Sequence, residues 1–258
     1  MHAALHRTAQ SCRLQYLSLP RVSNTRKSIT AGSVVKRGVN SMASTELPER
    51  ARAVLEYWFG PEFATSEESF VPKDKMRLWF QGGPDVDQYI TEHFGNDVRL
   101  VGEGKYDSWS HNGNPLSTLA GIVLMDQFTR NIHRGQPAAF QLDSQALAWA
   151  DRAVAEGADQ RLPPMLRYFV YMPYMHAEDL AVQERGVQLF RTATETTAAA
   201  GPACAAAASC LRMALSYAEA HRDVIASWGR FPHRNAILGR ESTAAEVAGL
   251  ADGSIKKF

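Results

Sequence analysis

Residues 115–130 read PLSTLAGIVLMDQFTR, an apolar segment that begins with proline and ends in polar side chains. On a helix of about 3.6 residues per turn, Asp126 and Arg130 share a side with Leu119 and Ile122, and the opposite side is also apolar. A helix that is apolar all round is buried in a core. The segment therefore predicts a central buried helix, with an i,i+4 ion pair that is either a structural lock or part of a polar site.

Proline and glycine mark helix starts and ends along the rest of the chain. The expected helices are 49–59, 73–81, 85–103, 116–130, 138–156, 165–171, 174–194, 202–228 and a short one after the capping box at 243–246. A break is expected at Pro173, between the sixth and seventh of them. No alternating strand pattern interrupts the series, so we expect an all-α fold of packed antiparallel helix pairs.

The first part of the chain differs from the rest, because residues 1–43 contain seven Lys and Arg side chains and no Asp or Glu. An acid-free leader rich in Arg and Ser, without an apolar run, is typical of an organellar transit peptide. We expect import into the mitochondrion in preference to the chloroplast, with a disordered basic tail as the alternative. Met42 offers a second start that would give a cytosolic form. Residues 44–258 are expected to form one helical domain.

Charge and motif content exclude several kinds of partner. When the seven basic residues of the leader are taken from the total of 28, the remaining 21 face 27 acidic residues, a formal net charge of −6. General nucleic-acid and anionic-membrane binding need a broad basic surface, so we expect neither partner. No apolar run approaches the roughly 18 residues of a membrane span. Neither a G-x-G-x-x-G nor a P-loop motif occurs, and we expect no cofactor.

A second polar segment, residues 229–240, reads GRFPHRNAILGR, and its Gly and Pro residues predict a loop. Arg230, Arg234 and Arg240, together with Asn235, carry donors that suit a carboxylate or a phosphate, because guanidinium groups bind such groups bidentately. In the alternative, these arginines pair with acidic side chains elsewhere and hold the last segment in place. The acidic partners considered for them are Asp126, Asp143 and Glu178.

Two histidines are candidates for proton transfer. His176 is expected on the core-facing side of a helix, next to Gln183, and His233 lies in the second polar segment. Asp126 or Glu178 would orient the imidazole of either histidine. The alternative for His176 is a hydrogen-bonded core histidine. On a regular helix Glu178 lies nearly opposite His176, so the two would not share a metal ion.

Several motifs together resemble one protein family. They are VLEYWFG at 54–60, LMDQFTRN at 124–131, YMPYMHAED at 171–179, GRFPHRN at 229–235 and LGREST at 238–243. The chain is similar in these motifs to domain-of-unknown-function family 924, and the similarity covers nearly all of residues 47–258. The resemblance implies a tetratricopeptide-like helical fold and no established activity.

The polar residues in these motifs suggest a site for a small anionic molecule, with hydrolase- or lyase-type acid–base chemistry. The expected catalytic residues are His176, His233, Asp126 and Glu178. The expected substrate-binding residues are Arg130, Asn131, Arg134, Arg230, Arg234, Asn235 and Arg240. No metal ligand is assigned.

Two alternatives remain open from the sequence. One is a tetratricopeptide-like interaction scaffold that binds the terminal carboxylate of a peptide or protein through the same arginines. The other is a metal-dependent enzyme whose ligands would come from the acidic residues and histidines Asp126, His176, Glu178, His221 and His233. This last alternative is the weakest, because no Glu-x-x-His pair recurs as a di-iron helix bundle requires.

Overall fold

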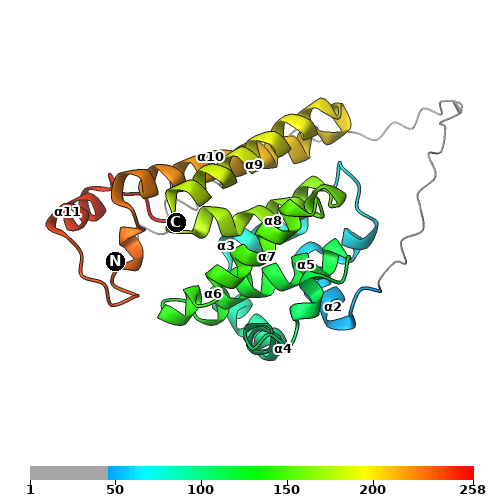
Figure 1. Ribbon diagram of the computed structural model, residues 1–258, viewed down its shortest axis with the longest axis horizontal. Helices are drawn as coiled ribbons and strands as arrows, with labels where there is room; N and C mark the ends of the chain where they lie inside the picture. The colour runs from blue at the N-terminus through cyan, green and yellow to red at the C-terminus, as the bar shows by residue number, and fades with distance from the viewer. Residues whose placement is uncertain (1–45) are drawn as a thin grey trace, which may run out of the picture.

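Helices follow one another along residues 46–258, which are the residues that the computed structural model describes (Figure 1). The α-helices are α2 (Glu49–Phe59), α3 (Met76–Gln81), α4 (Pro84–Gly102), α5 (Pro115–Ile122), α6 (Thr129–Ile132), α7 (Asp143–Ala155), α8 (Pro164–His176), α9 (Leu180–Ala199), α10 (Ala205–Trp228) and α11 (Ala244–Asp252). No strand occurs within this range. The all-α prediction is confirmed, whereas the expectation for residues 1–43 lies outside the described residues.

The two longest helices, α9 and α10, lie side by side as an antiparallel pair along one edge of the molecule (Figure 1). Helix α8 packs against both of them and also contacts α7 and α5, which connects this pair to the rest of the bundle. Helix α11 lies beyond one end of the pair (Figure 1). In residues 46–258 no helix has both the length and the apolarity needed to cross a membrane.

The central segment is buried as expected, but it is not a uniform α-helix. Helix α5 runs into a π-helical turn, η4 (Val123–Phe128), which is followed by the short helix α6. Thr129 reinforces the wider turn, because both its backbone N–H and its hydroxyl donate to the carbonyl oxygen of Leu124, the hydroxyl at 3.0 Å. Such π turns are frequent at functional sites, and this one contains Asp126.

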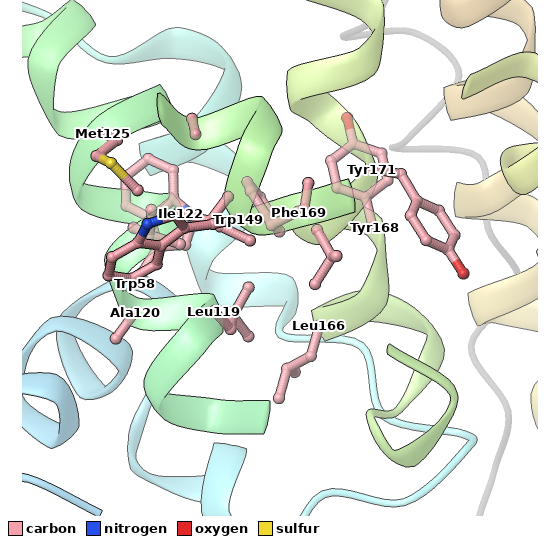
Figure 2. Close-up of a cluster of buried hydrophobic side chains, with 14 of the residues drawn as sticks. Trp58, Leu119, Ala120, Ile122, Met125, Trp149, Leu166, Tyr168, Phe169 and Tyr171 are labelled. Carbon is pink, nitrogen blue, oxygen red and sulfur yellow. The ribbon is translucent and has the colours of Figure 1, made fainter. Parts of the chain in front are cut away.

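The hydrophobic core surrounds this central segment. Figure 2 shows Trp58 and Trp149 at one end of a buried cluster and Tyr168 and Tyr171 at the other. The close approach of α7 to α5 depends on Gly121, because a Cβ atom there would lie 2.0 Å from the ring of Trp149. The absence of a side chain at this position therefore decides how deeply α7 packs.

The expected break at Pro173 is wrong. Pro173 lies inside α8, which continues to His176, and the chain turns only at residues 177–179. Asp179 caps α9 by accepting from the N–H of Val182 at 3.0 Å, and Gln183 donates to the carbonyl oxygens of Met175 in α8 at 2.7 Å and of Ala177 in the turn at 2.8 Å. These capping bonds place the boundary after His176, so His176 and Gln183 do not share one helix face.

Candidate functional site

A buried acid–histidine pair lies where α8 meets the π turn. The Nδ1 atom of His176, at the last position of α8, is 2.7 Å from Oδ1 of Asp126, whose side chain is only 1% exposed. The second carboxylate oxygen accepts from Gln127 at 2.6 Å. Because an ionised carboxylate can only accept, we assign the imidazole proton to Nδ1. The Nε2 atom then carries a lone pair, and it has no hydrogen-bond partner among residues 46–258.

The surroundings favour a charged aspartate and a neutral histidine. Burial alone would raise the pKa of Asp126, but the charges of His176 and Arg130, with the hydrogen bonds to the carboxylate, lower it to about 2. Burial lowers the pKa of His176, although Asp126 opposes this shift. Since Arg130 is permanently charged, it maintains the ionisation of Asp126 even when His176 is neutral.

Two arginines and a second aspartate complete what we call the central cluster, defined as Asp126, Arg130, Asp143, His176 and Arg234. Arg130 lies 3.3 Å from Asp126 and 2.9 Å from Asp143. Burial raises the pKa of Asp143 despite the attraction of Arg130. The cluster therefore joins four parts of the fold: the π turn with α6, the start of α7, the end of α8 and the segment after α10.

Arg234 is the least satisfied cation of the central cluster. Its residue is 7% exposed, its Nη1 donates to the carbonyl oxygen of His176 at 3.1 Å, and it lies 3.7 Å from Asp143. Its guanidinium carbon lies 4.6 Å from the ring centre of Phe140 and 4.4 Å from that of Phe231. Its Nε has no hydrogen-bond partner within the described part of the chain. Burial, followed by repulsion from Arg130, lowers the pKa of Arg234 to about 10.

Other arginines from the second polar segment pair with carboxylates outside the central cluster. Arg240 binds Glu178 through two bonds of 2.5 and 2.9 Å, and Glu178 also accepts the backbone N–H of Phe231 at 2.7 Å. Arg230 binds Glu246 of α11 at 2.7 and 2.8 Å. The contacts of Glu178 hold residues 231–240 against the bundle, as the structural alternative for the arginines expects, whereas the Arg230–Glu246 pair ties the segment to α11.

The remaining amide and arginine candidates do not reach the central cluster. Asn131 donates to Asp87 of α4 at 2.8 Å, and Arg134 donates to the same carboxylate through two bonds of 2.6 and 2.8 Å. These bonds tie α6 to α4. Asn235 is fully buried and donates to the hydroxyl of Ser242 at 3.0 Å. The seven residues expected to bind a substrate are therefore divided among separate contacts, and two of them, Arg130 and Arg234, lie in the central cluster.

Two more histidines lie beyond the central cluster, at the end of the α9–α10 pair. The ring centre of His221 is 6.1 Å from that of His176 and 3.5 Å from that of Phe258. Burial, with repulsion from His176, lowers the pKa of His221 to about 3. Burial and repulsion from Arg234 lower the pKa of His233 to about 4. Both histidines are therefore neutral at neutral pH.

The sequence analysis named Asp143 only as a possible ion-pair partner of the arginines, and it did not name Phe140 at all. Asp143 is the first residue of α7, where an acid is ordinary, and Phe140 lies in a short 3₁₀ turn, so neither gave a distinct signal. Within the described range, no group of three or more His, Cys, Asp or Glu side chains is arranged to hold a metal ion. The metal-dependent alternative thus has no ligand set to support it in residues 46–258.

Fold and site together define an all-α protein with a buried Asp–His–Arg cluster. The chain belongs to a family described as bacterial protein of unknown function (DUF924), whose model matches residues 54–254. A solved structure of a protein of unknown function from Agrobacterium tumefaciens is 31% identical, covers 79% of this chain and 97% of its own, and has a TM-score of 0.63. No curated protein matches the chain. The family resemblance seen in the sequence is confirmed, and it assigns no activity.

Proposed function

We propose that the central cluster binds a small anionic molecule and that His176 acts on this molecule as a general base. The observation that carries the proposal is the incomplete bonding of Arg234, a buried guanidinium with an unpartnered Nε and a carboxylate no nearer than 3.7 Å. Buried arginines are normally paired closely, because an unpaired buried charge is costly. A carboxylate or phosphate group would supply the missing acceptor.

The chemistry follows from the Asp126–His176 pair. Asp126 holds the imidazole through Nδ1, which leaves the Nε2 lone pair available to take a proton from water or from the bound molecule. The carboxylate would also stabilise the imidazolium that forms, as the aspartate of a catalytic triad does. Such proton removal suits a hydrolase or a lyase, and Arg234 would hold the anionic group while the proton moves.

The test is a thermal-shift screen of the full chain against small carboxylates and phosphates, with Arg234→Gln beside Arg240→Gln. Arg240 serves as the matched control because it is a neighbouring arginine that pairs with Glu178 outside the cluster. At a ligand concentration of about 100 times Kd, binding contributes roughly 2.7 kcal/mol, or a rise in Tm of about 5–10 °C for a domain of this size.

We expect the wild type and Arg240→Gln to show equal rises and Arg234→Gln to show a clearly smaller one, because it loses the part that binding at the central cluster contributes, whatever the basal Tm of each variant. An equal rise in Arg234→Gln would contradict the proposal. A response only to peptides with free C-termini, and not to small anions, would favour the interaction scaffold instead.

A further inference from the structure

A cavity of about 170 Å³ lies between α8, α9 and the short 3₁₀ turn η6 (Asp159–Arg161). Its lining residues are Gln160, Arg167, Tyr171, Arg185, Gln188, Leu189, Thr192 and Ala193. None of them belongs to the central cluster. The volume has room for several water molecules or for one small ligand.

The buried arginine of this cavity, Arg167 on α8, has only neutral partners. The residue is 6% exposed, and its two bonds go to the side-chain oxygen of Gln160 at 3.2 Å and the carbonyl oxygen of Leu162 at 2.9 Å. Within residues 46–258, Arg167 forms no ion pair and its Nε has no hydrogen-bond partner. A guanidinium buried to this degree ordinarily bonds a carboxylate directly.

The nearby acid does not fill this role, because Gln160 lies between the two charges. The amide nitrogen of Gln160 donates to Asp159 at 2.6 Å while its oxygen accepts from Arg167. Asp159 is 1% exposed and receives a second bond of 2.6 Å from the hydroxyl of Tyr171. Both bonds reach the same oxygen, Oδ2, and Oδ1 of Asp159 has no hydrogen-bond partner within residues 46–258, so this carboxylate does not bond Arg167 directly.

A second guanidinium, that of Arg185 on α9, also lines the cavity. Its side chain is 49% exposed and bonds Asp151 at 2.7 Å, so it lies toward solvent while Arg167 lies inside. We propose that this cavity is a second binding site, distinct from the central cluster, for a small anion that bears a carboxylate or phosphate group. Arg167 binds the anion directly, and Arg185 closes the site from the solvent side.

The experiment titrates inorganic phosphate and acetate separately into the full chain by calorimetry, at an ionic strength matched with sodium chloride. The variants are Arg167→Gln, Arg185→Gln and Arg191→Gln, all with Arg234→Gln in the background so that the central cluster does not contribute. Arg191 is the matched control, because it lies on the same helix as Arg185 and pairs with Glu219 away from the cavity. Circular dichroism checks that each variant remains helical.

We expect one of the two anions to bind the Arg234→Gln chain and its Arg191→Gln derivative equally, and the one that binds identifies the ligand group. Arg185→Gln should weaken this binding by about tenfold, and Arg167→Gln should abolish it. If Arg167→Gln does not fold, the difference in anion affinity between Arg185→Gln and Arg191→Gln still shows whether the anion binds in this cavity. The absence of binding by either anion, or equal binding in the Arg185 and Arg191 variants, would overturn the proposal.

Discussion

At the scale of single residues, Asp126 controls the protonation of its neighbour. Its carboxylate accepts from His176 and lies beside Arg130, so a permanent positive charge and a titratable ring compete for one buried acid. Burial lowers the pKa of the His176 imidazole, and the Asp126 charge raises it in part. The ring is therefore a neutral base at neutral pH, which the proposed chemistry requires.

We predict that Asp126→Asn lowers the pKa of His176 further, because the variant loses the negative charge that favours the imidazolium. Removal of a close opposite charge shifts a pKa by roughly 1–3 units. The measurement is an NMR titration of the histidine ring resonances in both proteins. A wild-type His176 pKa above the ordinary value of about 6.5, or a rise in the variant, would contradict this account.

At the scale of elements, the contact between α5 and α7 depends on one glycine. We predict that Gly121→Ala destabilises the protein by about 1–3 kcal/mol, since the new methyl group would overlap the Trp149 ring. Gly95→Ala on α4 is the control, because nothing lies within 4 Å of a Cβ atom there. The free energy of unfolding of this control should rise by about 0.5–1 kcal/mol, because alanine has a higher helix propensity than glycine. Urea unfolding measures the free energy of unfolding of both variants, and an equal change in the two would refute the packing argument.

The segment after α10 is held by the Glu178 carboxylate, which binds Arg240 and the N–H of Phe231. We predict that Glu178→Gln increases local opening of residues 229–243, with amide hydrogen exchange there about tenfold faster. Glu219→Gln removes a more exposed pair with Arg191 and should leave that exchange unchanged. Unaltered exchange in Glu178→Gln would show that apolar contacts alone hold the segment.

At the scale of the whole molecule, buried neutral histidines make stability depend on pH. The folded pKa of His221 is about 3 and that of His233 about 4, both below the ordinary value near 6.5. The unfolded chain therefore binds these protons first, and the free energy of unfolding falls as the pH drops from 6.5 toward 4. The carboxylates of Asp126 and Glu246, whose pKa values are lowered to about 2, begin to lose their contribution as the pH falls below their ordinary pKa values near 4 and lose it fully only below about pH 2.

We predict that His221→Gln reduces the loss of stability between pH 6.5 and 4.5 by on the order of 2 kcal/mol. The measurement is urea unfolding at several pH values in this window, for the variant and the wild type. Identical pH slopes in the two proteins would mean that His221 is not buried in its neutral form.

Much of the fold was predictable because local signals and tertiary packing agree. The burial of residues 115–130 follows from their apolar character, and Thr243 caps α11 through the expected capping box. The π turn at Asp126 was not predictable, since its extra residue depends on packing and on the Thr129 bonds. Nor was the continuation of α8 through Pro173, where the capping by Asp179 decides the end of the helix.

The candidate site was predictable only in part. The sequence pointed to Asp126, His176 and Arg234 by residue type, and the structure brings these three together. The sequence pointed equally to the other arginines of residues 229–240, yet Arg230 and Arg240 bind acids outside the central cluster. Contacts between residues 50 or more positions apart depend on how the helices pack, and residue type alone does not reveal which arginine lacks a partner.

The central claim is that an anion binds between Arg234 and Nε2 of His176. It is tested most directly by following the His176 ring resonances during titration with the most stabilising anion, in wild type, Arg234→Gln and Arg240→Gln. We predict a saturable shift of the His176 Nε2 resonance in the wild type and in Arg240→Gln, and none in Arg234→Gln. Anion binding that leaves His176 unchanged, or a full shift in Arg234→Gln, would contradict the claim.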